Sequence, residues 1–263
     1  MSKIIVEKSE VIKNKKLGRG FHVLTIAPFS KLKAIGPGQF VHIRIPDSNI
    51  FFRRAFSIYD IDLKNNSFDI IFKVFGRGTK LMSGMAEGGT VDILGPLGNN
   101  FKLPVKKETV FLAGGGIGMP PMYFLAKRLI EKKYDKNRIL FFYGGNTKDD
   151  LVDLARIRRL GVTILPSSLD GTIGFKGLIT TAIENKLEKI KGPKRIYACG
   201  PEGMLKAIDA LARKGNIPGQ VSLEAPMPCG VGICLGCILP LRAGGYTRVC
   251  REGPVYDIGE VLL

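Results

Sequence analysis

Cys229-Gly230-Val231-Gly232-Ile233-Cys234-Leu235-Gly236-Cys237, followed by Cys250, is the stretch around which the rest of the chain is organised. Three thiols within nine residues cannot share one face of a helix or of a strand, so they must point inward from a loop wrapped around a common centre. Glycines stand between the cysteines, and glycine permits positive φ angles and close backbone approach. The stretch therefore predicts a loop whose backbone N–H groups point at sulfur.

Written as spacing, the motif is C-x4-C-x2-C-x12-C. The first two spacings are those of a plant-type [2Fe–2S] site. A structural zinc site and a disulfide pair are the alternatives, but zinc sites favour paired C-x2-C units and this motif contains a single one. We therefore predict a [2Fe–2S] cluster held by Cys229, Cys234, Cys237 and Cys250, which would carry one electron at a time.

Length and composition describe a globular protein with sizeable cores. The 263 residues fit two domains and an appendage, with 45% apolar and 24% charged residues. Five cysteines, four of them in one motif, indicate a reducing compartment and not a disulfide scaffold. Met1–Glu7 lacks the apolar core of a signal peptide, and the uncharged run 109–126 contains too many glycines and prolines for a membrane helix. We expect a cytoplasmic protein that does not enter a membrane.

The formal charge of +17 raises the possibility of a nucleic-acid partner. Lysines and arginines are dispersed along the chain, however, and no nucleic-acid-binding motif accompanies them. We expect a solvated basic surface and no nucleic-acid binding. Attraction of anionic cofactors or of an acidic partner protein is the alternative interpretation.

The first hundred residues are typical of antiparallel β-structure, because short segments of alternating hydrophobicity are separated by turn signals. Six such segments predict a small six-stranded β-barrel. The expected strands cover residues 4–12, 21–27, 40–45, 55–59, 68–75 and 90–94. A short helix over 79–85, with Thr79 as its N-cap, is expected between the last two.

After the turn-forming cluster Gly95-Pro96-Leu97-Gly98-Asn99-Asn100, strands and helices alternate, which predicts a doubly wound parallel α/β domain. We expect a β-domain over 1–100, an α/β domain over 101–219 and a cluster-binding segment over 220–263. The expected strands are 110–113, 139–143, 162–165, 195–199 and 220–223, the last closing the domain. The expected helices are 120–133, 149–159, 176–185 and 202–214.

The first strand–helix turn of this domain is a candidate dinucleotide site. It reads Ala113-Gly114-Gly115-Gly116-Ile117-Gly118-Met119-Pro120-Pro121, and glycines at such a turn let the backbone approach a pyrophosphate. A proline suits the first helical turn, where no N–H is needed. The full G-x-G-x-x-G fingerprint is absent because residue 119 is Met, so a tight structural turn is the alternative. No residue at the end of the next strand distinguishes NAD from NADP.

Cys199-Gly200-Pro201 follows another strand of the same sheet and opens a helix. Ligands of such sheets bind beyond the carboxyl ends of the strands, so Cys199 is expected to face a nicotinamide. A small buried residue at a strand end is the alternative interpretation.

A flavin is expected between these two sites, because nicotinamide exchanges hydride and an iron–sulfur cluster exchanges single electrons. In the β-domain, Arg53-Arg54-Ala55-Phe56-Ser57 offers a guanidinium for a pyrophosphate, a ring for packing and a hydroxyl donor. Gly76-Arg77-Gly78-Thr79 opens a helix and is a second candidate anion site. A solvated arginine pair and a core phenylalanine are the alternatives. His22 and His42 are isolated, and we expect neither to be a ligand.

The order R-A-F-S, G-R-G-T, G-G-G-I-G and C-G-P resembles the ferredoxin–NADP reductase superfamily over residues 1 to about 220. With the cysteine motif and Gly253-Pro254-Val255, the whole chain resembles the electron-transfer subunits of class B dihydroorotate dehydrogenases. One departure is Phe56, where the superfamily often has Tyr, so a hydroxyl contact to the flavin is lost. The resemblance implies FAD contacts at Arg54, Ala55, Phe56, Ser57, Ile71, Phe72, Lys73, Gly78 and Thr79.

The same resemblance implies a partner: a separate FMN-containing catalytic subunit that oxidises dihydroorotate, in a heterotetramer of two copies of each chain. Electrons would pass from that FMN through the cluster and FAD to NAD⁺. The flavin and iron–sulfur subunit of an NAD(P)H:ferredoxin or sulfide-type oxidoreductase is the alternative within this fold. A zinc-stabilised nucleotide-binding module is the alternative of another class.

Overall fold

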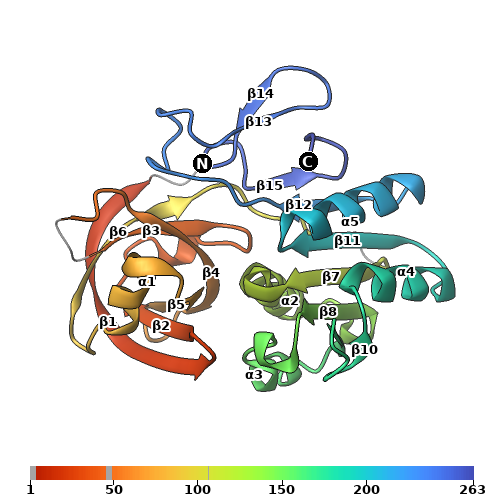
Figure 1. Cartoon of the computed structure of the whole chain (residues 1–263), viewed down its shortest axis with the longest axis horizontal. Coiled ribbons are helices and arrows are strands. Elements are labelled where there is room, and N and C mark those ends of the chain that lie inside the picture. The colour runs from red at the N-terminus through yellow and green to blue at the C-terminus, as the bar shows by residue number, and fades with distance from the viewer. Residues whose placement is uncertain (1–3, 46–48, 106) are drawn as a thin grey trace.

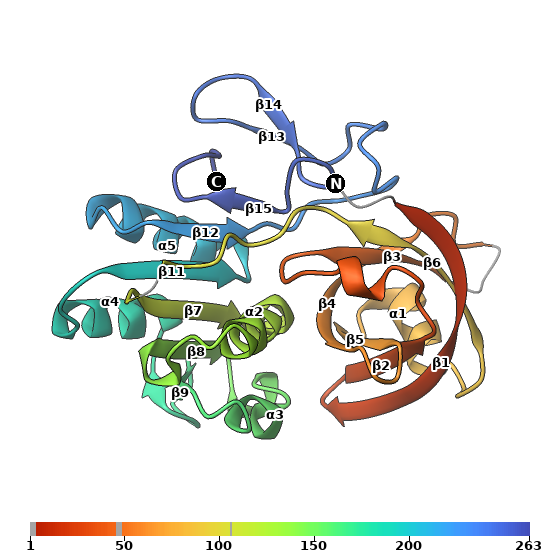
Figure 2. The ribbon, with the colours of Figure 1, turned by 180° about the vertical axis from the view of Figure 1, so that it is seen from behind.

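The computed structural model describes residues 4–45, 49–105 and 107–263. Figure 1 shows a β-barrel and an α/β domain side by side, with the C-terminal segment lying across both. The hairpin of β13 (Ile238–Pro240) and β14 (Tyr246–Arg248) belongs to this C-terminal segment. It lies at the top of the molecule in Figure 1 and also in Figure 2, which shows the chain from behind. The predicted fold class is confirmed. No helix in the described part of the chain is long and apolar enough to cross a membrane.

The barrel is closed, with strand order β1-β2-β5-β4-β3-β6. Inward-facing side chains such as Val41 and Ile43 of β3 form its core. The first strand was expected to end at residue 12 but continues to Gly18, because its second half pairs with β2 after its first half pairs with β6. The strands are β1 (Ile5–Gly18), β2 (Phe21–Ala27), β3 (Phe40–Arg44), β4 (Arg54–Asp62), β5 (Ser67–Lys73) and β6 (Thr90–Leu97).

The short helix α1 (Gly76–Ser83) begins three residues earlier than expected. Thr79 as its N-cap is wrong: Phe75 occupies the N-cap position. The Thr79 hydroxyl instead accepts a hydrogen bond from the Phe75 N–H at 2.6 Å and donates to the Phe75 carbonyl at 2.9 Å. Gly76 has a φ of 79°, which glycine adopts without strain, and so the chain turns into the helix before Thr79.

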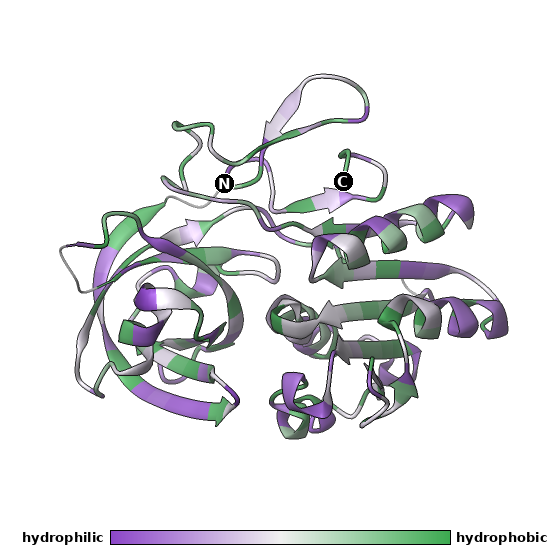
Figure 3. Cartoon of the chain, in the orientation of Figure 1, coloured by the Kyte–Doolittle hydropathy of each residue, from purple (hydrophilic) through white to green (hydrophobic). Residues whose placement is uncertain are grey.

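The α/β domain contains a seven-stranded sheet with order β10-β9-β8-β7-β11-β12-β15. Alternate residues of β7 face opposite layers: Val110 and Leu112 pack with α2, while Phe111 and Ala113 pack with α4 and α5. Figure 3 shows hydrophobic β7 and β8 beside helices of mixed hydropathy. The strands are β7 (Thr109–Gly115), β8 (Ile139–Gly145), β9 (Thr163–Ser168), β10 (Phe175–Lys176), β11 (Lys194–Cys199), β12 (Gly219–Ser222) and β15 (Val255–Asp257).

Two of the four α-helices of this domain differ from expectation. The helix expected over 149–159 is a 3₁₀ turn, Lys148–Asp150, followed by α3, because Asp153 between them has a left-handed φ of 53°. The helix expected over 176–185 starts later, because residues 175–176 pair as the edge strand β10. The helices are α2 (Met119–Glu131), α3 (Leu154–Arg158), α4 (Ile179–Lys189) and α5 (Glu202–Lys214).

The C-terminal segment completes the sheet. The strand expected over 220–223 is β12, the last parallel strand of the sheet, and β15 pairs antiparallel with it on its outer side. Asn99 ties this segment to the chain that leaves the barrel, since its side chain donates to the carbonyls of Glu252 and Val255 and accepts from the Val255 N–H. The cysteine motif is therefore fixed to both domains.

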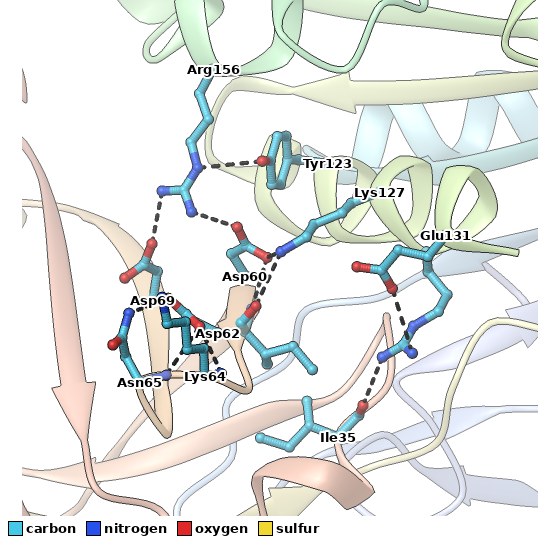
Figure 4. A network of polar contacts seen from close by, with 12 residues as sticks. Ile35, Asp60, Asp62, Lys64, Asn65, Asp69, Tyr123, Lys127, Glu131 and Arg156 are labelled. Carbon is cyan, nitrogen blue, oxygen red and sulfur yellow. Dashed lines mark hydrogen bonds and ion pairs between the residues drawn. The ribbon is translucent and has the colours of Figure 1, made fainter.

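The two domains are joined by ion pairs on the side shown in Figure 4. Arg156 of α3 donates to Asp69 of β5 at 2.7 Å and also pairs with Asp60 of β4. Lys127 of α2 pairs with the same Asp60 carboxylate. The Arg156 guanidinium also lies 4.6 Å from the centre of the Tyr59 ring. These partly buried ion pairs link α2 and α3 of the α/β domain to β4 and β5 of the barrel.

Candidate functional site

A cavity of about 760 Å³ lies between the barrel and the α/β domain. This volume is in the range of small-molecule and cofactor sites. The barrel contributes every residue for which the sequence implied a flavin contact, and β11 contributes Cys199. The predicted residues in its lining are Arg54, Ala55, Phe56, Ser57, Ile71, Phe72, Lys73, Gly78, Thr79 and Cys199.

The two adjacent arginines at the start of β4 have different surroundings. Arg53 is tied to β6, where its guanidinium donates to the Asp92 carboxylate at 2.8 Å and to the Asp92 carbonyl at 2.9 Å. Arg54 lines the cavity and lies beside the start of α1: a Cβ added to Gly78 would be 3.7 Å from its Nε. Arg54 and the first N–H groups of α1 thus form one positive site, which suits a phosphate group.

On the opposite side of the cavity, Cys199 is accompanied by two residues that precede the cysteine motif, Ser222 and Glu224. Cys199 is only 2% exposed, and burial, reinforced by the Glu224 carboxylate, raises the pKa of its thiol. Partial loss of hydration in the cavity also raises the pKa of Glu224, whose side chain is still exposed to solvent. The sequence assigned no role to Glu224; its position in the cavity and its raised pKa make it a candidate hydrogen-bond or proton donor.

The glycine-rich turn between β7 and α2 lies very close to the turn after β11. At most of its glycines, a side chain would collide with neighbouring atoms. A Cβ on Gly118 would be 2.2 Å from the Cys199 carbonyl oxygen, and one on Gly115 would be 2.7 Å from the Met204 sulfur. A Cβ on Gly114 would be 3.0 Å from the Met119 Cα. Gly116 differs, because it has a φ of 52° and open space in front of it.

Gly200 belongs to the same contact, since a Cβ there would be 3.0 Å from the backbone of Gly115. Its φ of 156° and the N-cap position of Pro201 at α5 turn the chain away from the sheet. The expected proline in the first turn of α2 is confirmed. The predicted dinucleotide residues therefore meet at the carboxyl ends of β7 and β11, where such sheets bind ligands.

The four cysteines of the motif lie in two pairs, and all five cysteines of the chain are free thiols. The sulfur atoms of Cys237 and Cys250 are 3.3 Å apart, and Cys229 and Cys234 are hydrogen-bonded through their side chains. Two thiolates per iron is the ligand requirement of a [2Fe–2S] cluster. Within the described residues, no three His, Cys, Asp or Glu side chains form a site for a single metal ion.

Backbone N–H groups point at these sulfur atoms, as the glycines predicted. Burial of Cys229 opposes its ionisation, but hydrogen bonds from the N–H groups of Val231, Cys234 and Ile233 outweigh burial and lower its pKa to about 6. Two further N–H groups, of Gly236 and Cys250, each lie 3.4 Å from a cysteine sulfur. Thiolates held by N–H donors fit an anionic iron–sulfur cluster.

Comparisons with known proteins also place the cluster-binding region and the NAD-binding region in separate parts of the chain. Residues 224–262 match the family model described as the iron-sulfur cluster binding domain of dihydroorotate dehydrogenase B, and residues 112–210 match the oxidoreductase NAD-binding domain. The chain is 35% identical over 260 residues to a Bacillus cereus protein named dihydroorotate dehydrogenase B (NAD(+)), electron transfer subunit, covering 96% of this chain and 97% of that one. An Enterococcus faecalis protein of the same name is 36% identical, with 98% of both chains covered.

Two solved structures show the same architecture. A structure of NADH-dependent reduced ferredoxin-NADP oxidoreductase superposes with a TM-score of 0.85 at 30% identity, covering 97% of this chain and 89% of that chain. A ferredoxin NADP+ reductase from Neisseria gonorrhoeae with bound FAD and NADP superposes with a TM-score of 0.67 at 18% identity, covering 80% and 92%. The second likeness concerns the fold alone.

Proposed function

The chain belongs to the family of dihydroorotate dehydrogenase B (NAD⁺) electron-transfer subunits, and from this premise we propose which of its residues carry the electron transfer. It is an oxidoreductase subunit that uses FAD, a [2Fe–2S] cluster and NAD. When bound, FAD supplies the exchange between hydride and single electrons, and the cluster supplies single-electron transfer. The tasks of this chain are to bind these groups, order them and exclude water.

One observation carries this proposal: the segment that leads into the cysteine motif also forms part of the cavity lining. Met227, two residues before Cys229, lines the cavity together with Arg54 and Ser57 of the barrel. Pro254, four residues after Cys250, lines it as well. A flavin in the cavity and a cluster in the loop are then neighbours, with no domain movement needed between them.

In this arrangement Arg54 and the start of α1 hold the FAD pyrophosphate, and Phe56 and Phe72 pack near the flavin ring. The remaining barrel residues of the lining, Ala55, Ile71, Lys73, Gly78 and Thr79, complete the flavin site. Ser57 donates its hydroxyl to the flavin. Cys229, Cys234, Cys237 and Cys250 hold the cluster.

The nicotinamide of NAD enters beside Cys199, beyond the carboxyl ends of β7 and β11. Gly116 gives the pyrophosphate access to the backbone at the start of α2, because it alone of the predicted glycines in that turn faces open space. Gly114, Gly115, Gly118, Gly200 and Pro201 shape the two turns. Cys199 stays neutral because burial raises the pKa of its thiol, so it contacts the nicotinamide as a small uncharged group.

The partner we propose is the FMN-containing catalytic subunit that oxidises dihydroorotate, in a heterotetramer of two copies of each chain and in the reducing cytoplasm. The test is to purify the tagged chain from its own organism without air, identify the chain that accompanies it, and measure flavin, iron and acid-labile sulfide. Recovery with an FMN-containing dihydroorotate-oxidising subunit supports the proposal. Colourless protein with stoichiometric zinc would contradict it.

A second candidate function is that of an NAD(P)H:ferredoxin oxidoreductase subunit. It is favoured by the 30% identical structure of NADH-dependent reduced ferredoxin-NADP oxidoreductase, which matches nearly the whole chain. The same purification separates the two functions. A partner that reduces ferredoxin, in place of a dihydroorotate-oxidising one, would establish the second.

Replacing Arg54 by Ala should weaken FAD binding roughly tenfold to a hundredfold, because charge-assisted hydrogen bonds to a phosphate are worth about 1.5–3 kcal/mol. The measurement is the FAD dissociation constant from flavin fluorescence during titration of the apoprotein. Arg44→Ala is a matched control, since Arg44 is exposed at the end of β3 and outside the cavity lining. Equal affinity in both variants would place the pyrophosphate elsewhere.

A further inference from the structure

His42 of β3 is a buried polar side chain without a hydrogen-bond partner among the described residues. It is 0% exposed, and both of its ring nitrogens are left unpaired by residues 4–45, 49–105 and 107–263. Buried polar groups in proteins are nearly always hydrogen-bonded, so an unpaired imidazole needs a specific explanation. The other histidine, His22, is only partly buried, and its Nδ1 lies 3.1 Å from the Asn14 side-chain oxygen.

The position of His42 lies between the cavity and the cysteine motif. Val41 and Ile43 point into the barrel core, so the alternating pattern of a strand places His42 on the outer face of β3. There it is directly opposite Ala55, and Phe40 on the same face is opposite Ser57. Ala55, Ser57 and Phe40 all line the cavity proposed for FAD.

The ring of His42 lies directly against the cysteine loop. A Cβ added to Gly230, the residue after Cys229, would be 2.6 Å from the ring Cε1, 2.7 Å from Nδ1 and 3.0 Å from Nε2. The edge of the imidazole that carries both nitrogens therefore faces the loop backbone. Gly230 has a φ of 71°, so glycine alone satisfies both the backbone conformation and the contact.

We propose that His42 donates its ring N–H to a sulfur atom at this end of the [2Fe–2S] site, either the Cys229 thiolate or a cluster sulfide, and thereby raises the reduction potential of the cluster. Reduction adds negative charge, and a hydrogen bond to sulfur stabilises the more negative form. His42 is thus a positioning residue that sets a potential, and iron ligation remains with the cysteines. Apart from family membership, this inference rests on the proposed function in one respect: it requires that a cluster is bound.

The protonation state of His42 agrees with this role. Burial, followed by the charge of Arg53, lowers its pKa to about 4, so at neutral pH the ring is uncharged and carries one N–H donor. The uncharged ring can donate a hydrogen bond to a thiolate or sulfide without adding a positive charge to the barrel wall.

The first test is a redox titration of the cluster, followed by electron paramagnetic resonance, in the intact complex. His42→Leu removes the donor but keeps an apolar volume, and should lower the equilibrium constant for one-electron reduction by about tenfold, which is about 59 mV. His42→Gln keeps an amide donor and should recover part of the difference. His22→Leu is the control and should leave the potential of the cluster unchanged.

The second test begins with the wild type, so its first outcome does not depend on how well a variant folds. The wild-type complex is labelled with ¹⁵N-histidine, and electron spin-echo envelope modulation of the reduced cluster should show coupling to one histidine nitrogen. His42→Gln should alter this coupling and His22→Leu should not. An unchanged potential in cluster-loaded His42→Leu, or absence of the coupling in the wild type, overturns the inference. Absence of the cluster itself from the wild type would instead refute the proposed function.

Discussion

The variant Cys234→Ala should retain NADH-dependent reduction of an artificial dye while losing all electron exchange with the catalytic partner. Cys234 is exposed, so its replacement removes a proposed cluster ligand without disturbing a core. The proposed flavin and dinucleotide sites lie in the cavity and at the carboxyl ends of β7 and β11, and Cys234 does not line that cavity. Iron and sulfide content should fall with the partner-dependent activity, and the FAD content should stay at the wild-type level.

Ile233→Ala is a matched control for cluster loading, because Ile233 is a neighbouring loop residue that is 79% exposed and carries no ligand. It should retain iron and sulfide. If Cys234→Ala loses dye reduction while FAD stays bound, the proposed order of the cofactors is wrong. If it keeps partner-dependent activity, Cys234 is not needed as a ligand.

A large effect on folding is expected for Gly118→Ala. The added methyl group would be 2.2 Å from the Cys199 carbonyl oxygen, 2.4 Å from the Cys199 carbonyl carbon and 2.6 Å from the Gly200 nitrogen, all of them backbone atoms that cannot rotate away. Overpacking of this kind costs about 3 kcal/mol or more, which lowers the melting temperature by roughly 6–12 °C for a protein of this size. Calorimetry of the FAD-loaded protein measures this directly.

Two glycines provide controls for that prediction. Gly203→Ala in α5 meets nothing within 4 Å and should stabilise the protein by up to about 1 kcal/mol, the helix preference of alanine over glycine. Gly116→Ala also meets nothing within 4 Å but has a φ of 52°, so it should cost about 1–2 kcal/mol of backbone strain. A stability of Gly118→Ala equal to that of Gly116→Ala would show that the two turns can separate without penalty.

The close contact of these turns and the interdomain ion pairs both make the interface between the two domains rigid. The turns fix Cys199 at the cavity, and Arg156 and Lys127 fix the α/β domain against Asp60 and Asp69 of the barrel. Both features would set the separation between the proposed nicotinamide and flavin sites. Hydride transfer needs the reacting atoms near 3–3.5 Å, so a rigid interface is directly relevant to its rate.

The sequence by itself determined whatever depends on neighbours along the chain. The spacing of Cys229, Cys234 and Cys237 with their glycines predicted a loop whose N–H groups point at sulfur, and the structure has such a loop. Alternation with a period of two predicted the barrel strands, and the alternation of strands and helices predicted the second domain. The turn of Gly114–Gly118 was recognisable because a strand, glycines and a helix start follow one another directly.

Only the tertiary structure decided what depends on residues far apart in the sequence. It distinguished Arg54, which faces the cavity, from Arg53, which is bound to Asp92 on another strand. It brought Glu224 to the cavity, added β15 to the sheet edge beyond β12, and divided the predicted helix at Asp153, whose side chain accepts a hydrogen bond from Tyr59 of the barrel. It also placed His42 against Gly230. The physical reason is that hydrogen bonds, ion pairs and steric exclusion act over a few ångströms in space, so partners separated by a hundred or more residues leave no local pattern in the sequence.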